Sequence, residues 1–333
     1  MSNIIEVNGL TKTFGNSLRV VDGISFSVGE GEIFSLLGPN GAGKTTTIRM
    51  LTTLASITEG TAMVAGHDVM KEPNAVREII GVVPQEVTLD NELKGIENLL
   101  LAGKLQHVPN SVAKSRALEL LRLVELDGFA DKKVGTYSGG MKRRLQLVAA
   151  LVHQPRILFL DEPTVGLDIQ TRTRIWDYIT RLNDEQGVTI FMTTHYLEEA
   201  DRLSDVVSIM DRGTIKVEGT PTELKDSLHG DVLTITVADG GDDLTGFLQS
   251  IPHVAEVTRT DDSYRLKLPK VESALPEIIT TVASKGLKIT ETSFSKPTLD
   301  QVFLEITGRS MRDAEEANNH YDSHASVHAR ETR

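Results

Sequence analysis

Eight consecutive residues near the N-terminus have the types and spacing of a phosphate-binding loop, Gly38-Pro39-Asn40-Gly41-Ala42-Gly43-Lys44-Thr45. Glycines at these positions let successive backbone N–H groups converge on phosphate oxygens, and a helix that starts here adds its positive dipole. Lys44 is expected to reach the β- and γ-phosphates, and the Thr45 hydroxyl to meet Mg²⁺. Together with Thr46, which follows, this complete Walker A loop predicts a site for a nucleoside triphosphate.

Two adjacent carboxylates, Asp161 and Glu162, follow the apolar segment Ile157–Leu160. On a strand beside the phosphate loop, Asp161 would face Mg²⁺, and Glu162 would face the γ-phosphate and polarise the attacking water. Taken alone, the segment would be interpreted as an acidic strand end exposed to water. Because the phosphate loop is also present, it predicts a Walker B segment and nucleotide hydrolysis.

The elements that must hold these groups alternate, over residues 1 to about 220, between short apolar runs and helical patterns. Such alternation is typical of a parallel sheet covered by helices on both faces. The strand candidates are Ile33–Leu37, Ile79–Val83, Ile157–Leu160, Val188–Thr193 and Val206–Met210. Amphipathic helices are predicted over Leu93–Gln106 and Ser111–Leu126. We therefore predict an α/β fold, a P-loop NTPase core interrupted by a helical insertion over roughly residues 86–137.

Four further groups are candidate site residues: Gln85, Ser138-Gly139-Gly140, Asp168 and His195. Gln85 and His195 each follow a strand candidate, and the serine-glycine run precedes a helical segment. With the two Walker segments, their order and spacing resemble the nucleotide-binding subunit of ATP-binding cassette (ABC) transporters over about residues 3–220.

The resemblance implies a role for each of these positions. Gln85 looks like the Q-loop glutamine, Asp168 like the D-loop aspartate, and His195 like the switch histidine at the γ-phosphate. The implied catalytic residues are Lys44, Gln85, Glu162 and His195. The implied Mg²⁺ ligands are Thr45, Gln85 and Asp161.

The run Ser138-Gly139-Gly140 resembles the signature loop of the family. Ser138 can cap the helix that follows, while the N–H groups of Gly139 and Gly140 offer a second anion-binding helix N-terminus. In the family, two subunits pair head to tail, and the signature of one closes over the ATP of the other. The resemblance therefore implies a homodimer, or a pair with a related ATPase, that shares its ATP sites.

Two positions depart from the usual family pattern. Phe14 lies where the family usually has a tyrosine that stacks on adenine; it keeps the π-face and lacks the phenolic hydrogen bond. Met141 lies where the family commonly has glutamine, so one polar side chain near the dimer interface is absent. Phe14 remains the predicted adenine-stacking residue, and the serine and glycines of the signature are intact.

Composition limits the classes of partner. The 333 residues are 39% hydrophobic and 25% charged, as in an ordinary globular protein of two domains, and the absence of cysteine excludes disulfides and thiol catalysis. A net charge of -12 and a pI near 5.3 argue against a nucleic-acid partner. The chain has neither a signal-peptide pattern nor a run of 18 apolar residues. We expect a cytoplasmic protein, peripheral on the cytoplasmic face of the cell membrane and docked on separate membrane-spanning permease subunits.

The C-terminal third differs in character from residues 1–228, the predicted nucleotide-binding domain. Strand and helix candidates in the order βαββαβ over residues 231–307 predict a small α+β, ferredoxin-like accessory domain, ending in a helix capped by Thr298. This ending resembles that of the ATPase subunits of daunorubicin-resistance-type drug exporters; the alternative is a stabilising appendage. Residues 309–333 are predicted to be a disordered tail, in which His320, His324 and His328 either bind a transition metal or are solvated.

The combined prediction is an ATP-binding and ATP-hydrolysing subunit of an ABC exporter, in which ATP closes the dimer and hydrolysis reopens it. One alternative is a soluble ABC ATPase with a mechanical or regulatory role, although such proteins usually carry long coiled-coil insertions or two cassettes. The other is an import ATPase, although the C-terminal domain looks unlike the barrel of many sugar-import ATPases. The transported molecule is not visible in this sequence, since the path of the cargo belongs to the partner.

Overall fold

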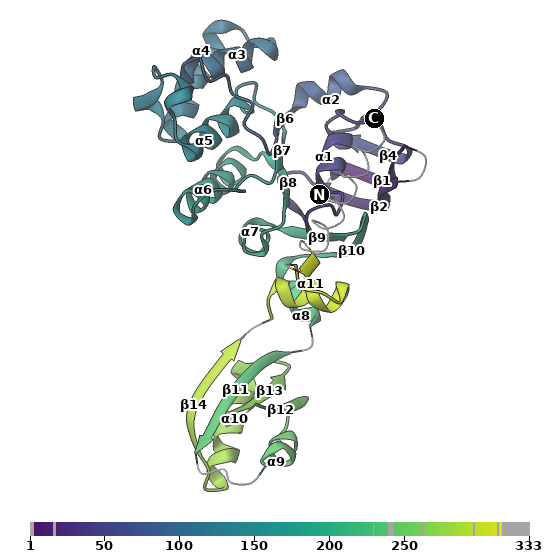
Figure 1. The fold of residues 1–333 in the computed structure, drawn as a ribbon, viewed down its shortest axis with the longest axis vertical. Helices are drawn as coiled ribbons and strands as arrows, with labels where there is room; N and C mark the ends of the chain where they lie inside the picture. The colour runs from purple at the N-terminus through teal and green to yellow at the C-terminus, as the bar shows by residue number, and fades with distance from the viewer. Residues whose placement is uncertain are drawn as a thin grey trace, which may run out of the picture. The chain divides into compact units, whose positions relative to one another are not determined.

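The computed structural model describes residues 3–15, 18–228, 230–238, 243–260, 263–295, 297–311 and 313–314. The chain divides into two compact units, Met1–Thr220 together with Met311–Arg333, and Pro221–Ser310. The division lies before α8 (Pro221–Ser227), a segment that the sequence analysis assigned to the nucleotide-binding domain. Figure 1 shows the elements of both units.

The centre of the first unit is a six-stranded sheet. Its strand order is β10 (Thr214–Gly219), β9 (Val206–Asp211), β3 (Ile33–Leu37), β8 (Thr189–Thr194), β7 (Ile157–Asp161) and β6 (Ile80–Val83). All neighbours are parallel except β10, which pairs antiparallel with β9. The five predicted strands are confirmed, with ends shifted by one residue at most. Because β3, β7 and β8 are parallel neighbours, their carboxyl ends lie at one edge of the sheet, where the chemical groups follow.

A second, antiparallel sheet in the same unit was not predicted. It has the order β2 (Leu18–Gly29), β1 (Asn3–Phe14), β4 (Glu59–Val64) and β5 (His67–Asp68). Helix α1 (Lys44–Leu51) contacts β2 and β4 of this sheet and β7 and β8 of the parallel sheet. A core on this side includes stacked phenylalanine rings of Phe26 and Phe34 at 5.2 Å. The two sheets thereby enclose the helix that begins at the phosphate loop.

The other face of the parallel sheet carries the helical insertion and most of the remaining helices, whereas Val76 of the helix Pro73–Ile79 belongs to the core on the α1 side. The helices of this unit, α1 apart, are α2 (Pro73–Ile79), α3 (Gly95–Leu105), α4 (Asn110–Leu123), α5 (Gly139–Ala149), α6 (Ile169–Gln186) and α7 (Leu197–Leu203), with short 3-10 turns at Asp127–Phe129 and Val134–Thr136. Helices α3, α4 and α5 pack against one another and share a core with α6 and the sheet. The predicted helical insertion is confirmed.

The second unit contains a four-stranded sheet in the order β12 (Glu256–Thr260), β13 (Ser263–Leu268), β11 (Asp231–Ala238) and β14 (Lys288–Ser295), with all neighbours antiparallel. Helices α9 (Thr245–Gln249) and α10 (Val271–Ser284) complete the order βαββαβ. This is the predicted ferredoxin-like topology. Helix α11 (Leu299–Thr307) follows, begins at a Thr298 capping box, and packs on α8.

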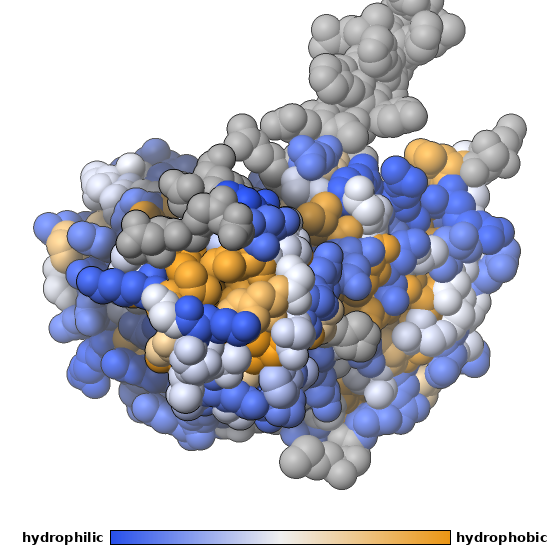
Figure 2. Space-filling model, turned by 90° about the horizontal axis from the view of Figure 1, so that it is seen from below, coloured by the Kyte–Doolittle hydropathy of each residue, from blue (hydrophilic) through white to orange (hydrophobic). Residues whose placement is uncertain are grey.

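The surface of the described residues is largely hydrophilic on the face seen in Figure 2, with patches of apolar side chains among the polar ones. In the described ranges, no helix has the length and apolar character needed to cross a bilayer. Within the same ranges, no group of three or more histidine, cysteine or acidic residues is arranged to hold a metal ion. The predicted tail histidines, His320, His324 and His328, lie outside the described residues.

Candidate functional site

The phosphate loop connects β3 to α1 and leaves no room for a side chain at Gly38 and Gly43. A Cβ at Gly38 would lie 2.1 Å from the carbonyl oxygen of Met210. Gly43 has a φ of 108°, and a Cβ there would lie 2.7 Å from the carbonyl oxygen of Val20. The loop is therefore held tightly against neighbouring backbone, which preorganises its N–H groups at the start of α1.

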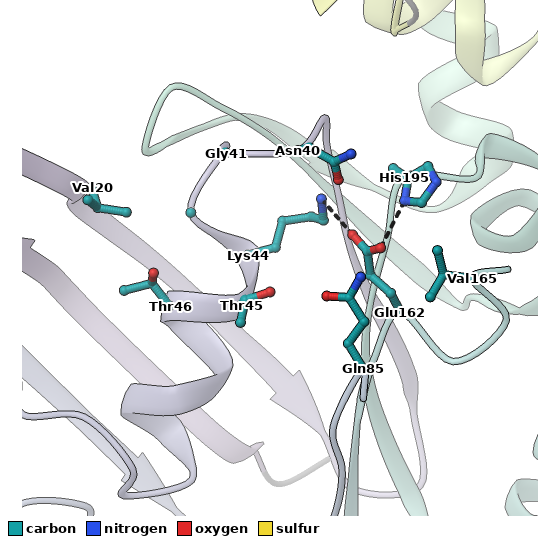
Figure 3. A pocket seen from close by; sticks show the side chains of 11 residues that line it. Val20, Asn40, Gly41, Lys44, Thr45, Thr46, Gln85, Glu162, Val165 and His195 are labelled. Atoms are coloured by element: carbon teal, nitrogen blue, oxygen red, sulfur yellow. Dashed lines mark hydrogen bonds and ion pairs between the residues drawn. The ribbon is translucent and has the colours of Figure 1, made fainter. Parts of the chain in front are cut away.

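A pocket of about 430 Å³ opens beside this loop (Figure 3). It gathers side chains and backbone from five separate segments of the chain. The lining residues predicted from the sequence are Asn40, Gly41, Gly43, Lys44, Thr45, Thr46, Gln85, Glu162 and His195. Val20 and Val165 also line the pocket and were not predicted, because an isolated valine carries no chemical signal in a sequence.

Glu162 lies between two basic side chains of the pocket (Figure 3). Its Oε1 is 3.3 Å from Lys44 Nζ, and its Oε2 accepts a 3.1 Å hydrogen bond from His195 Nδ1. Lys44 Nζ also donates to the carbonyl oxygens of Gly38 at 2.7 Å and Pro39 at 3.0 Å. Burial alone would raise the pKa of Glu162, but the His195 hydrogen bond and the Lys44 charge outweigh it, so the pKa is lowered. The carboxylate is therefore ionised at neutral pH and available as a proton acceptor.

The backbone at Glu162 has a φ of 47°, a left-handed conformation that is unusual for a residue other than glycine. Its N–H donates to the carbonyl oxygen of Thr193 at 3.1 Å and to the Thr193 hydroxyl at 3.2 Å. The anchored, strained turn points the side chain into the pocket.

Asp161, at the end of β7, forms a cluster of oxygen atoms with two hydroxyl groups. Its Oδ1 accepts hydrogen bonds from Thr45 Oγ1 at 3.0 Å and from Thr193 Oγ1 at 2.6 Å. The register of β7 and β8 sets this contact by placing Asp161 opposite Thr193. A carboxylate with adjacent hydroxyls is the kind of donor set that Mg²⁺ prefers, so these residues fit a magnesium ion. Thr193 was not predicted as a site residue, because it has no motif of its own.

The remaining predicted residues lie outside the lining of this pocket. Phe14 is 47% exposed, and Lys12 Nζ lies 4.9 Å from the centre of its ring. Ser138 caps α5, accepting from the backbone N–H of Met141, and Asp168 caps α6, accepting from the N–H of Thr171 at 3.0 Å.

The run Ser138-Gly139-Gly140 nevertheless lies close to the start of α6, which Asp168 caps. A Cβ at Gly140 would lie 2.6 Å from Thr171 Cγ2, on the first turn of α6. The capping hydrogen bonds of Thr171 lower the pKa of Asp168, which is exposed and ionised. The starts of α5 and α6 thus form a second group of candidate residues, separate from the pocket.

Comparison with known proteins identifies both parts of the chain. Family models match for the ABC transporter over residues 21–165 and for the C-terminal domain of DrrA1-3-like ATP-binding proteins over residues 219–307. The daunorubicin/doxorubicin resistance ATP-binding protein DrrA of Streptomyces peucetius is 42% identical over 315 residues, with 93% of this chain and 94% of the relative covered. The linearmycin resistance ATP-binding protein LnrL of Bacillus subtilis is 37% identical, with 93% and 100% covered.

Among solved structures, the dimeric structure of a post-hydrolysis state of the ATP-binding cassette MJ0796 bound to ADP and Pi has a TM-score of 0.60 at 28% identity. The match covers 65% of this chain and 98% of that one. The family resemblance inferred from the motifs is therefore confirmed. The chain belongs to the ATP-binding proteins of ABC transporters, ATPases that power transport, in the group that carries a DrrA1-3-like C-terminal domain.

Proposed function

We propose that the pocket binds the phosphates of ATP and that Glu162 activates the water that attacks the γ-phosphate. The observation that carries this proposal is the placement of the Glu162 carboxylate, ionised and held between Lys44 and His195 beside the phosphate loop. An ionised carboxylate can accept the proton of the attacking water. The ammonium of Lys44 stabilises the charge on the phosphate oxygens, and His195 orients the carboxylate and the γ-phosphate.

Mg²⁺ would be held by Thr45 and Asp161, with Gln85 at the same side of the pocket. When bound, the ion supplies positive charge that neutralises the phosphate oxygens as the bond to the leaving group breaks. The buried hydroxyl of Thr193 keeps the Asp161 carboxylate oriented. Phe14 ends β1, the strand paired with β2, whose Val20 lines the pocket, and it offers its exposed ring to adenine.

A second copy of the chain, or a related ATPase, completes the site in this proposal. The group at Ser138, Gly139, Gly140 and Asp168 lies outside the pocket yet has the polar helix start that binds an anion. A head-to-tail pair would bring this group of one subunit to the γ-phosphate of the other.

The proposed partner in the membrane is a permease of the exporter, on the cytoplasmic face. An apolar groove of about 360 Å³ supports this part of the proposal. It runs between the sheet and the helical insertion, and its rim carries Leu54 and Leu105, which are 68% and 72% exposed. Thr88 and Leu89, just after Gln85, also line it, so an occupant of the groove would touch the loop that enters the ATP pocket. We propose a short cytoplasmic helix of the permease as the occupant.

Two experiments test these proposals. Lys44→Ala should abolish both ATP binding and hydrolysis in a folded protein, whereas Lys71→Ala, an exposed lysine outside the pocket, should leave both intact. Retained ATP affinity in Lys44→Ala would place the phosphates elsewhere. Leu105→Glu should reduce co-purification of the permease while ATP affinity is kept, and unchanged recovery would remove the groove as the docking site.

A further inference from the structure

Arg143 is a buried cation on helix α5 that the ATP pocket does not use directly. Its side chain is only 5% exposed, yet all three guanidinium nitrogens make hydrogen bonds. Nε donates to the carbonyl of Pro163 at 2.7 Å. Nη1 donates to the carbonyls of Pro84 at 2.6 Å and Gln85 at 3.2 Å, and to Gln146 Oε1 at 2.9 Å. Nη2 donates to the carbonyls of Asp161 at 3.2 Å and Glu162 at 3.0 Å.

These partners belong to two loops that are far apart in the sequence. One is the loop after β6 that carries Gln85, and the other is the turn after β7 that carries Glu162. Gln146, one turn further along α5, strengthens the first contact because its Nε2 donates to the carbonyl of Glu86 at 2.7 Å. A single helix thus holds the backbone of both loops that supply catalytic candidates to the pocket.

The chemistry of arginine suits this connection. A buried charge is costly unless it is well hydrogen-bonded, and here carbonyl oxygens provide the bonds. Burial lowers the pKa of Arg143 to about 10, so the side chain stays charged at neutral pH. The planar guanidinium can reach separate carbonyls at fixed angles, whereas a lysine ammonium is a single point with three donors. Lysine could therefore retain the charge but could not hold both loops together.

Helix α5 begins at the signature residues, with Ser138 as its cap. Arg143 lies within its first two turns, so a displacement of the helix start carries the guanidinium with it. We propose that Arg143 is a positioning residue that couples the signature end of α5 to the placement of Gln85 and Glu162. Contact of the signature loop with the nucleotide of a partner subunit would then align the hydrolytic groups of the same chain. This inference rests on the roles proposed above for Glu162 and the signature loop.

The test is Arg143→Lys, compared with Arg144→Lys on the same helix. Arg144 donates to the carbonyl of Val124 at 2.6 Å and lies 3.7 Å from Glu125, away from both loops. A misplacement of about 1 Å at a reacting group costs roughly 100-fold in rate, so Arg143→Lys should lower kcat by about 10- to 100-fold. KM and ATP affinity should stay within about twofold, because the phosphate loop is untouched. Arg144→Lys should keep the parent kcat.

ATP-dependent dimerisation is a second measurement that distinguishes a positioning role of Arg143 from a merely structural one. A structural role predicts that dimerisation and turnover are lost together. In the Glu162→Gln background, Arg143→Lys should still form the ATP-dependent dimer, since the signature residues themselves are unchanged. A dimer that forms but hydrolyses slowly is the expected result. A parent-like kcat in Arg143→Lys would overturn the inference, and so would a loss of kcat matched by equal losses of ATP affinity and thermal stability.

Two further measurements keep the outcome decisive. If Arg143→Lys does not fold, Gln146→Met removes the amide that holds Arg143 and the Glu86 carbonyl, and should lower kcat by about 3- to 10-fold at constant KM. A parent-like kcat in that variant would overturn the inference. Glu162→Gln alone, assayed in parallel, separates the two proposals: if it hydrolyses ATP normally, the role of Glu162 fails; if it is inactive while Arg143→Lys is active, only the coupling fails.

Discussion

Thr193→Val removes one buried hydroxyl group that no sequence motif identifies. The side chain is 0% exposed, and its hydroxyl donates to Asp161 Oδ1 at 2.6 Å and accepts from the Glu162 N–H at 3.2 Å. Valine keeps the branched shape and loses both interactions. The variant therefore tests whether this hydroxyl holds the two adjacent carboxylate residues in place.

The expected loss of stability follows from the partners of the two hydrogen bonds that the substitution removes. A hydrogen bond to a charged group contributes about 1.5–3 kcal/mol to stability, against about 1 kcal/mol for a neutral pair. The Glu162 N–H keeps the Thr193 carbonyl oxygen at 3.1 Å, so the variant does not leave this N–H without a partner. The main loss is the charged bond to Asp161. We expect the free energy of unfolding to fall by about 1.5–3 kcal/mol.

Equilibrium urea denaturation without nucleotide measures this difference, and calorimetric titration with ATP and Mg²⁺ measures the effect on the site. Thr189→Val is the matched control: it lies on the same strand, is 0% exposed, and its hydroxyl accepts from the Gly31 N–H at 2.9 Å. Its ATP affinity in the presence of Mg²⁺ should equal that of the parent, whereas Thr193→Val should bind more weakly. A stability of Thr193→Val within about 0.5 kcal/mol of the parent would refute the reasoning.

Three further outcomes are expected. Phe14→Ala should weaken ATP binding by about 1–3 kcal/mol in a calorimetric titration, with little change in the saturated rate. Phe129→Ala, which removes another exposed ring beside a lysine, should leave ATP affinity unchanged. Unchanged affinity in Phe14→Ala would remove Phe14 from the site. Because the pKa of Glu162 is lowered in the folded chain, its ion pairs stabilise the fold above the unfolded value of 4.5, and this contribution is lost as the pH falls through the folded value. As the pH falls below 4.5, the urea midpoint of the parent should therefore fall more steeply than that of Glu162→Gln. Equal pH dependence of the two midpoints would contradict this. A chain that ends at Thr220 should bind ATP like the parent but lose ATP-dependent dimerisation or recovery with the permease. Loss of ATP affinity in a folded truncation would instead mean that residues after Thr220 support the site.

The parts of the fold that could be predicted from the sequence are those whose signals are local. The strands that end at the phosphate loop, at Asp161 and before His195 are short apolar runs followed by a chemical motif, and all of them are confirmed. The ferredoxin-like order of the second unit follows from the same kind of pattern. In both units the elements predicted from the spacing of hydrophobic residues are the elements found in the fold.

The antiparallel sheet of the first unit could not be predicted in this way. It pairs β1 with β4, whose partners such as Val7 and Ala62 are far apart in the sequence. Its strands also contain exposed, polar and glycine positions, so no continuous apolar run marks them. Such non-local pairing forms together with the core that packs against α1, so no local stretch of sequence indicates it.

The motifs predicted most of the residues that line the pocket, but not the side chains that hold these residues in place. Arg143 follows the signature loop in a stretch of basic residues that resembles a solvated helix face, yet it points inward to carbonyls of two distant segments. Thr193 likewise gains its role only from the strand register that places it beside Asp161. Positioning groups of this kind depend on tertiary neighbours, for which the chain carries no local signal.

The most direct test of the central claim is Glu162→Gln, measured for ATP binding and ATP turnover on the same purified protein. The amide keeps the shape of the side chain but cannot accept the proton of the attacking water. Removal of a positioned general base typically costs about 10²–10⁴ in rate. We predict that turnover falls by this factor, that ATP affinity stays within a few-fold of the parent, and that an ATP-dependent dimer accumulates in size-exclusion chromatography. Turnover within a few-fold of the parent would contradict the assignment of Glu162 as the catalytic base.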